Sequence, residues 1–180
     1  MGKNKKVINI SLNIRSIEKA INELKFIKSI IPQINEEFMN ESLTIIQNNA
    51  INNLVKRVKN FPNSANINNN WNINKAIAKS GGNALELRND NKVVALVEFG
   101  TGIVGKSNAH KLSQKLGYQY DVNNHAENGW DFDVIYKNEY YHFRGFKGYE
   151  GKSFLYDSFF DYFLLGEWKN VYQRIYDKYI

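Results

Sequence analysis

Apolar residues near the start of the chain follow two periods, first that of a strand and then that of a helix. Isoleucine and leucine alternate with polar residues over 8–14, which is typical of a half-buried strand. From Ser16, which can cap a helix, apolar residues recur every three or four positions through Ile27. Pro32 is expected to end that helix or to begin the next, which keeps helical spacing to Val58. The first third is therefore predicted to be a strand followed by long amphipathic helices.

Beyond a polar, asparagine-rich loop over 63–70, the pattern becomes that of strands. Residues 71–77 alternate, and the turn 89–91 is expected to join the strand before it to another over 93–99. That pairing predicts a β-hairpin. The segment 107–116, which follows a glycine-rich turn, is expected to be a weak helix or an ordered loop.

The second half of the chain alternates again and then returns to helical spacing. A short strand is expected over 118–122, and a second hairpin is expected to join 130–136 to 141–144 through a turn at Asn138. Three glycines then lead to a final helical region with a break at Gly166. This order predicts an α+β fold, with an N-terminal strand and long amphipathic helices packed on a mostly antiparallel sheet and a C-terminal helix.

No internal repeat or linker divides the chain. We therefore expect a single domain over 1–180, with an aromatic, helical C-terminal extension over about 166–180. Because 43% of the residues are hydrophobic, wholesale disorder is excluded. The absence of cysteine excludes disulfides and thiolate metal sites. No apolar run approaches the roughly 20 residues of a membrane span, and the start lacks a signal-peptide core, so no membrane association is expected.

The net charge of +6 permits an anionic partner without requiring one. The lysines are scattered along the chain, which favours a solubilising surface over a dedicated nucleic-acid site. A nucleic-acid-binding module remains an alternative, and a steep salt dependence of DNA affinity would support it.

One segment has the spacing of a nucleotide-binding loop. Residues 100–107 fit the phosphate-loop pattern G-x-x-x-x-G-K-[ST], in which Lys106 would reach the phosphates and Ser107 would hold Mg²⁺. The glycines also fit G-x-G-x-x-G. Both motifs belong in a strand–loop–helix unit of a parallel sheet, whereas the strand expected here belongs to an antiparallel hairpin. A nucleotide-binding protein that uses residues 100–107 is therefore kept as the alternative function.

The other candidate sites are weaker. The chain has three histidines, none of which is spaced with a second ligand on one helix: His110, His125 and His142. A calcium-loop-like run begins at Asp121, but Ala126 stands where such a loop needs glycine, and Phe132 where it needs glutamate. No nucleophile elbow occurs. We therefore assign no catalytic, metal-binding or cofactor-binding residue and expect no cofactor and no enzymatic activity.

Several short motifs lie in a fixed order between Val97 and Asp157. They are VEFGTG at 97–102, GYQYDVN at 117–123, His125, Gly129-Trp130, Arg144-Gly145 and GKSFLYD at 151–157. In this order they resemble the neck and tail-completion proteins of tailed bacteriophages, often described as minor tail or head–tail joining proteins. The chain departs from the family pattern in two places. It has no proline after Gly105, and its aromatic region beyond Leu165 is longer.

The resemblance implies a structural virion protein that is assembled in the host cytoplasm and completes the tail at the head–tail junction. Such proteins form a ring, here expected to be a homo-hexamer, between the head connector and the tail-terminator or tail-tube proteins. Genomic DNA would pass through the ring without specific binding. The expected partner contacts are in the glycine-rich turn and the aromatic tail, at Glu98, Gly100, Thr101, Gly102, Gly105, Lys106, Trp168, Tyr172 and Tyr176. Glu98 is also expected to lie across the strand from its apolar neighbours and to accept hydrogen bonds from amides of the turn.

Overall fold

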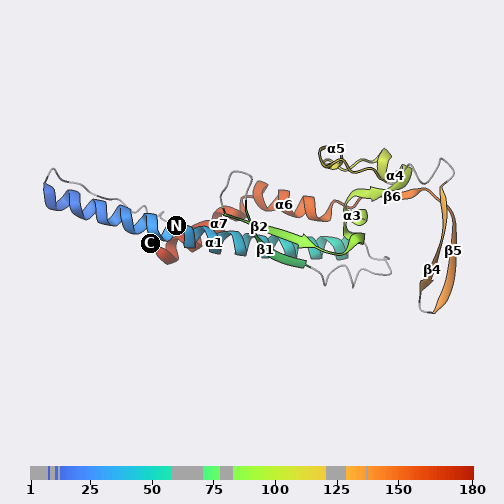
Figure 1. The fold of residues 1–180 in the computed structure, drawn as a ribbon, viewed down its shortest axis with the longest axis horizontal. Coiled ribbons are helices and arrows are strands. Elements are labelled where there is room, and N and C mark those ends of the chain that lie inside the picture. The colour runs from blue at the N-terminus through green and yellow to red at the C-terminus, as the bar shows by residue number, and fades with distance from the viewer. Residues whose placement is uncertain are drawn as a thin grey trace.

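One long helix organises the molecule (Figure 1). The computed structural model describes residues 8, 11, 13–57, 71–77, 83–120, 129–136 and 138–180. Helix α1 (Ile14–Arg57) has 44 residues. The elements that follow are β1 (Trp71–Ile77), β2 (Asn83–Asn89), α3 (Lys92–Phe99), β3 (Gly100–Thr101), α4 (Gly102–Ser107), α5 (Ser113–Leu116), β4 (Trp130–Tyr136), β5 (Glu139–Phe146), β6 (Gly148–Glu150), α6 (Phe154–Leu164) and α7 (Glu167–Tyr179). The predicted α+β class is confirmed.

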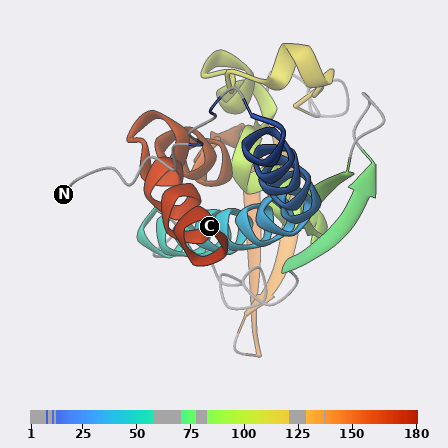
Figure 2. The same cartoon turned by 90° about the vertical axis from the view of Figure 1, so that its left-hand side faces the viewer.

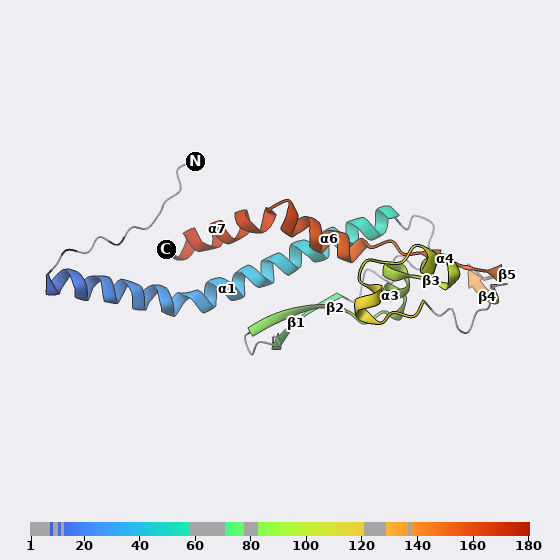
Figure 3. The same ribbon diagram turned by 90° about the horizontal axis from the view of Figure 1, so that it is seen from above.

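The other elements are arranged along α1 on two sides. Helices α6 and α7 lie on one side of it and the β1–β2 hairpin lies on the other, as Figures 2 and 3 show. The described strands form three separate two-stranded antiparallel sheets, β1–β2, β3–β6 and β4–β5. Apart from the β4–β5 hairpin, the larger elements are thus packed around a helix, whereas the sequence predicted helices packed on a mostly antiparallel sheet. None of the described helices combines the length and the apolar character needed to cross a membrane.

Helix α1 runs through Pro32, where the sequence predicted a break. A proline inside a helix costs about 3 kcal/mol, because it removes one hydrogen bond and crowds the preceding turn. Ile30 and Ile34, on either side of it, are both buried in one cluster with Val171 and Ile175 of α7. Burial of an isoleucine contributes about 1.5–3 kcal/mol, so the two together offset the proline. The helix is bent rather than straight (Figure 3).

The first predicted hairpin was assigned to the wrong pair of segments. The observed hairpin pairs β1 with β2, from Trp71 opposite Asn89 to Ile77 opposite Asn83. The predicted second arm, 93–99, is instead part of helix α3. An apolar run of this length fits either structure, and here burial follows the helical period, at Val94 and then at 97 and 98.

The second predicted hairpin is confirmed. Strands β4 and β5 pair antiparallel around Asn138, which adopts a left-handed conformation with φ of 64°. The strand expected over 118–122 is not observed in its described part, 118–120. The final helical region is confirmed as α6 and α7, with the break at Gly166. The expected loop 63–70 and most of the N-terminal strand 8–14 lie outside the described residues, and Ile14 begins α1.

The core follows the contact of α1 with the C-terminal helices. One buried cluster joins the C-terminal part of α1 to α3 and α6 through Leu54, Val97 and Phe154. Further along α1, Tyr162 of α6 is buried, and its hydroxyl lies 2.7 Å from the Ser42 hydroxyl. Both clusters depend on α6, so the start of α6 has to be placed accurately. The glycine-rich turn lies against that start.

Candidate functional site

The glycine turn, residues 98–107, is closed against the segment 147–151. Gly100 pairs with Glu150 and Thr101 with Tyr149, and Gly102 forms a bridge with Gly148. The backbones lie so close that a Cβ atom on Gly148 would come within 1.9 Å of the Thr101 carbonyl oxygen. A Cβ on Gly100 would lie 2.5 Å from the Gly151 nitrogen. These contacts explain the glycines by backbone packing.

The geometry of the glycine turn differs from that of a phosphate-binding loop. Helix α3 precedes it instead of a strand, and α4, which follows, has only six residues. The Gly102 N–H donates to the Tyr120 carbonyl at 2.6 Å, and the Val104 N–H donates to the Lys147 carbonyl at 3.1 Å. Two amides that a phosphate would need are therefore already bound to carbonyl oxygens. Lys106 and Ser107 are exposed.

Glu98 joins the turn to the start of α6. Its side chain is buried, and its Oε2 and Oε1 atoms accept hydrogen bonds from the backbone N–H groups of Leu155 and Tyr156, both at 2.9 Å. Ser153, the residue before α6, has no capping side-chain hydrogen bond. The Glu98 carboxylate therefore caps the helix from 57 residues away in the chain and complements its dipole. The sequence correctly predicted that Glu98 accepts hydrogen bonds from backbone amides. It was wrong in placing Glu98 on a strand, since the residue lies on helix α3, and in expecting the amides to come from the turn, since they come from α6.

His110 packs against this carboxylate. Its Nδ1 accepts from the Leu112 N–H at 3.1 Å, which leaves the proton of the neutral ring on Nε2. Nε2 lies 3.3 Å from Glu98 Oε1, in a direction that does not form a hydrogen bond. The ring also meets the edges of Phe99 and Tyr156, at centroid distances of 4.5 and 5.3 Å. His110 thus fills the space between the turn and α6.

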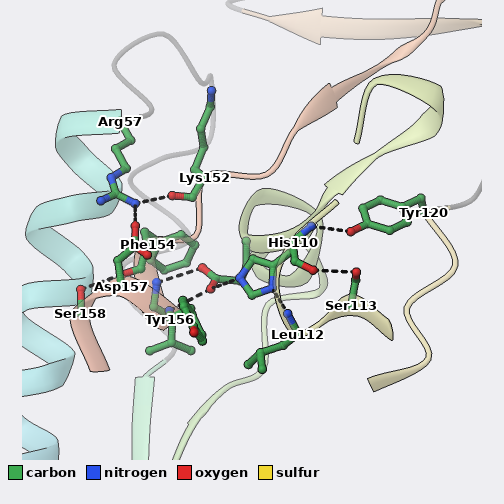
Figure 4. Close-up of polar contacts among 12 residues, drawn as sticks. Arg57, His110, Leu112, Ser113, Tyr120, Lys152, Phe154, Tyr156, Asp157 and Ser158 are labelled. Carbon is green, nitrogen blue, oxygen red and sulfur yellow. Dashed lines mark hydrogen bonds and ion pairs between the residues drawn. The ribbon is translucent and has the colours of Figure 1, made fainter. Parts of the chain in front are cut away.

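The backbone around His110 is held equally firmly. Its N–H donates to the Tyr120 hydroxyl at 2.7 Å, and its carbonyl accepts from the Ser113 hydroxyl at 2.7 Å (Figure 4). Arg57, at the end of α1, donates to Asp157 at 2.6 Å and to the Lys152 carbonyl. The site is therefore a structural junction that ties α1, the turn and α6 together. Sequence reasoning considered His110 only as a metal ligand, and no local signal indicates its packing partners.

The junction is largely closed to solvent. Glu98 and His110 are 5% and 6% exposed, and Glu98 also lines a groove of about 460 Å³ between β2 and α3. Within the described residues, no three His, Asp or Glu side chains are grouped so that they could hold a metal ion. His125 and the first eight residues of the calcium-loop-like run, 121–128, lie outside the described residues, and the end of that run is part of β4. A groove of about 590 Å³ lies between α1 and the β1–β2 hairpin, and at its rim Lys75 pairs with Glu36 at 2.9 Å.

The residues predicted for partner contact fall in two places. Those of the turn lie mostly inside the fold, since Glu98 and the residues at 100, 101, 102 and 105 are buried and only Lys106 is exposed. Those of the aromatic tail lie on α7, which packs on α1. Trp168 and Tyr176 border the buried cluster around Ile175. Tyr172 is 37% exposed and meets Phe38 edge-on at 5.4 Å. The structure does not bring the two sets together.

Comparisons of the chain with protein-family models, with curated proteins and with solved structures found no match. The geometry described above and the sequence resemblance are therefore the basis for a proposal about function.

Proposed function

We propose that the chain is a structural virion protein of a tailed phage, a tail-completion or neck component that joins the tail to the head connector as a ring. The ordered motifs between Val97 and Asp157 support this proposal by resemblance. The structural observation that supports it best is the β4–β5 hairpin, which stands away from the rest of the molecule (Figure 1).

The β4–β5 hairpin is built like an interaction arm. All of β5 except its last residue is exposed, and at the far end Ile135 and Tyr140 face each other across the ladder at 75% and 66% exposure. A single two-stranded hairpin is by itself only marginally stable in water. At its base, Trp130 packs edge-on against Phe146, with ring centroids 4.8 Å apart. An arm anchored at one end, with apolar residues at the other, fits insertion between neighbouring subunits of an assembly.

The closed glycine turn agrees with an assembly role. Its glycines are explained by packing, and its buried carboxylate is used to cap α6. In the ring that we propose, the chain acts through shape and contact surfaces and needs no cofactor. The DNA would cross the ring without sequence-specific contacts.

Immunogold labelling of intact phage particles tests the proposal. An antibody raised against the purified chain should place gold at the head–tail junction in negative stain. Particles disrupted to open the neck serve as the control for an occluded epitope. If disrupted particles also stay unlabelled while the antibody detects the protein in infected lysate, the neck role is wrong.

The nucleotide-binding alternative has its own discriminating variant. Lys106→Ala removes the lysine on which a phosphate loop depends, and it changes an exposed side chain near the end of the glycine turn. Under our proposal the wild type shows no Mg-ATP binding by calorimetry, and Lys106→Ala leaves particle assembly nearly intact. Micromolar Mg-ATP binding that this substitution abolishes would favour the alternative.

A further inference from the structure

We propose that two separate apolar faces of this chain bind each other between neighbouring copies, head to tail. The first, the α6 face, is formed by Phe159, Phe160, Phe163, Leu164 and the adjoining Leu165. The second, the α1 stripe, is formed by Ile14, Ile17, Ile21, Leu24 and Ile31. This inference deepens the proposed function by naming the interface of the ring, and it is tested on the purified protein.

The α6 face is far more apolar than is usual for the solvent-exposed side of a helix. Phe154 and Tyr162 fix the inner side of α6 against α1, where both are fully buried. The opposite side should then be polar, because a surface helix carries one apolar stripe. Instead, Phe159, Phe160 and Phe163 are 42–49% exposed, and Leu164 and Leu165 are 67% and 82% exposed. A helix that is apolar on both sides is typical of one enclosed between two layers.

The α1 stripe has the spacing of a helix-packing seam. Its members are separated by three, four, three and seven residues, which places them on one side of the helix at a and d positions of a heptad. Their exposed fractions run from 42% at Ile17 to 76% at Ile14. The first part of α1 extends past the end of α7 (Figure 3), so this stretch projects from the body.

The two faces are large enough to hold subunits together. A large aromatic side chain buries 150–250 Å² when enclosed, so five partly exposed apolar side chains offer roughly 500 Å² on each face. Joining the faces would bury roughly 1,000 Å² in total, near the lower limit for a specific interface. The largest apolar patch on a typical monomer is about 300–600 Å² and is often functional, and this chain has two of that size.

Charge favours pairing of unlike faces. Between Phe154 and Glu167 the chain carries no lysine or arginine and three acidic residues, of which Asp157 is already paired with Arg57. The stretch 14–31 carries four basic and two acidic residues, and the exposed Lys28 interrupts the stripe itself. Two α6 faces, or two stripes, would bring like charges together. An α6 face on a stripe brings acidic groups such as Asp161 near Lys28.

Pairing of unlike faces allows a closed ring. Each copy offers one α6 face and one α1 stripe, so the contact can repeat head to tail until a ring closes. A two-fold dimer in which each α6 face binds the other copy's stripe would stop at two copies. The mass of the wild-type oligomer separates the two arrangements.

Two double variants disable one face each. Ile21→Glu with Leu24→Glu alters the stripe, and Phe163→Glu with Leu164→Glu alters the α6 face. All four side chains are substantially exposed, so the fold should be kept, which circular dichroism and thermal unfolding check. Asn22→Glu and Asn170→Glu, at exposed positions outside the faces, are the matched controls.

Light scattering after size exclusion should show wild type and both controls as oligomers at about 100 µM. Each double variant should weaken association at least ~100-fold and elute as a 20.9 kDa monomer. Mixed in equal amounts, the two variants retain one intact junction between them, so they should form a heterodimer of twice that mass. A monomeric wild type, a folded variant that still self-associates, or a mixture that stays monomeric would each overturn the inference.

The association experiment and the gold labelling test the interface and the proposed function separately. Gold at the neck together with a monomeric mixture would leave the function standing and refute the interface. A heterodimer together with unlabelled, disrupted particles would support the interface and refute the place in the virion.

Discussion

Gly148 shows at the scale of one residue how the glycine turn is kept closed. Its φ is +92°, and a Cβ atom there would lie 1.9 Å from the Thr101 carbonyl oxygen. Gly117 has a similar positive φ of +67°, but a Cβ there would meet nothing within 4 Å. Comparing the two glycines therefore separates the cost of a positive φ from the cost of a steric clash between a Cβ atom and the backbone.

Gly148→Ala should therefore destabilise the protein far more than Gly117→Ala. We expect a loss of about 1–2 kcal/mol for Gly117→Ala from the left-handed conformation alone. For Gly148→Ala we expect roughly 3–5 kcal/mol, because the backbone also has to move apart. Urea unfolding of both variants measures the difference. Equal losses would show that the close approach of 101 and 148 is not rigid.

Glu98 provides the second prediction at this scale. Replacing it with alanine leaves two backbone amides at the start of α6 without an acceptor in a buried place. We expect Glu98→Ala to cost about 2–4 kcal/mol and Glu98→Gln, which keeps one acceptor oxygen, to cost about half as much. Chemical denaturation measures both. A loss below 0.5 kcal/mol for the alanine variant, on the scale of an ordinary surface change, would contradict the capping role.

The sequence identified one part of the junction, Glu98 and the glycines of the turn, but not what these residues contact. Glu98 and the glycines were singled out from local spacing alone. Their partners at 147–156 lie about fifty residues further on, and local patterns carry no information about pairs so distant. His110 was missed as a packing residue for the same reason.

At the scale of elements, a helix or strand was predicted correctly where one local sequence signal was decisive. The β4–β5 hairpin and the α6–α7 break were predicted because Asn138 and Gly166 mark turns that few other residues favour. The segment 93–99 was predicted as a strand because a short apolar run has no decisive period. Pro32 led to a wrong prediction, a break in the helix. The burial of apolar residues on both sides of it outweighs the tendency of proline to end a helix.

The docking of α7 on α1 leads to a prediction about pH. Hydrogen bonds from Lys178 and then Tyr179 lower the pKa of Glu37. An ordinary glutamate has a pKa of about 4.3, and above that pH the ionised form of Glu37 stabilises the fold. This stabilisation is lost as the pH falls through the lower pKa of the folded state. Wild type should therefore be more stable than Glu37→Gln at neutral pH, and the difference should vanish between about pH 5 and 3.

Thermal unfolding across that range measures the Glu37 effect. Glu18→Gln, which alters an exposed glutamate earlier in α1, is the control and should show no such dependence. A difference between wild type and Glu37→Gln that persists unchanged at pH 2.5 would show that the Glu37 charge contributes nothing to docking.

At the scale of the whole molecule, the two longer hairpins have different surroundings. The β1–β2 hairpin lies along α1, and Leu87 of β2 packs against the cluster around Ile34. The β4–β5 hairpin stands away from the helices and exposes its end (Figure 1). Under the proposed assembly role, a neighbouring subunit would cover the exposed end of this arm.

Ile135→Asp tests this directly, because the side chain is 75% exposed and its loss removes no intramolecular core. The free protein should keep its unfolding temperature within about 2 °C, as expected for a surface change of under 0.5 kcal/mol. Incorporation into phage particles, measured by complementing a deletion, should fall at least tenfold, since a charge buried without a partner is costly. Asn72→Asp, at an exposed position on β1, is the matched control and should incorporate normally. Normal incorporation of Ile135→Asp would mean that the end of the arm stays in water in the assembled particle, and the hairpin would then no longer support a neck role.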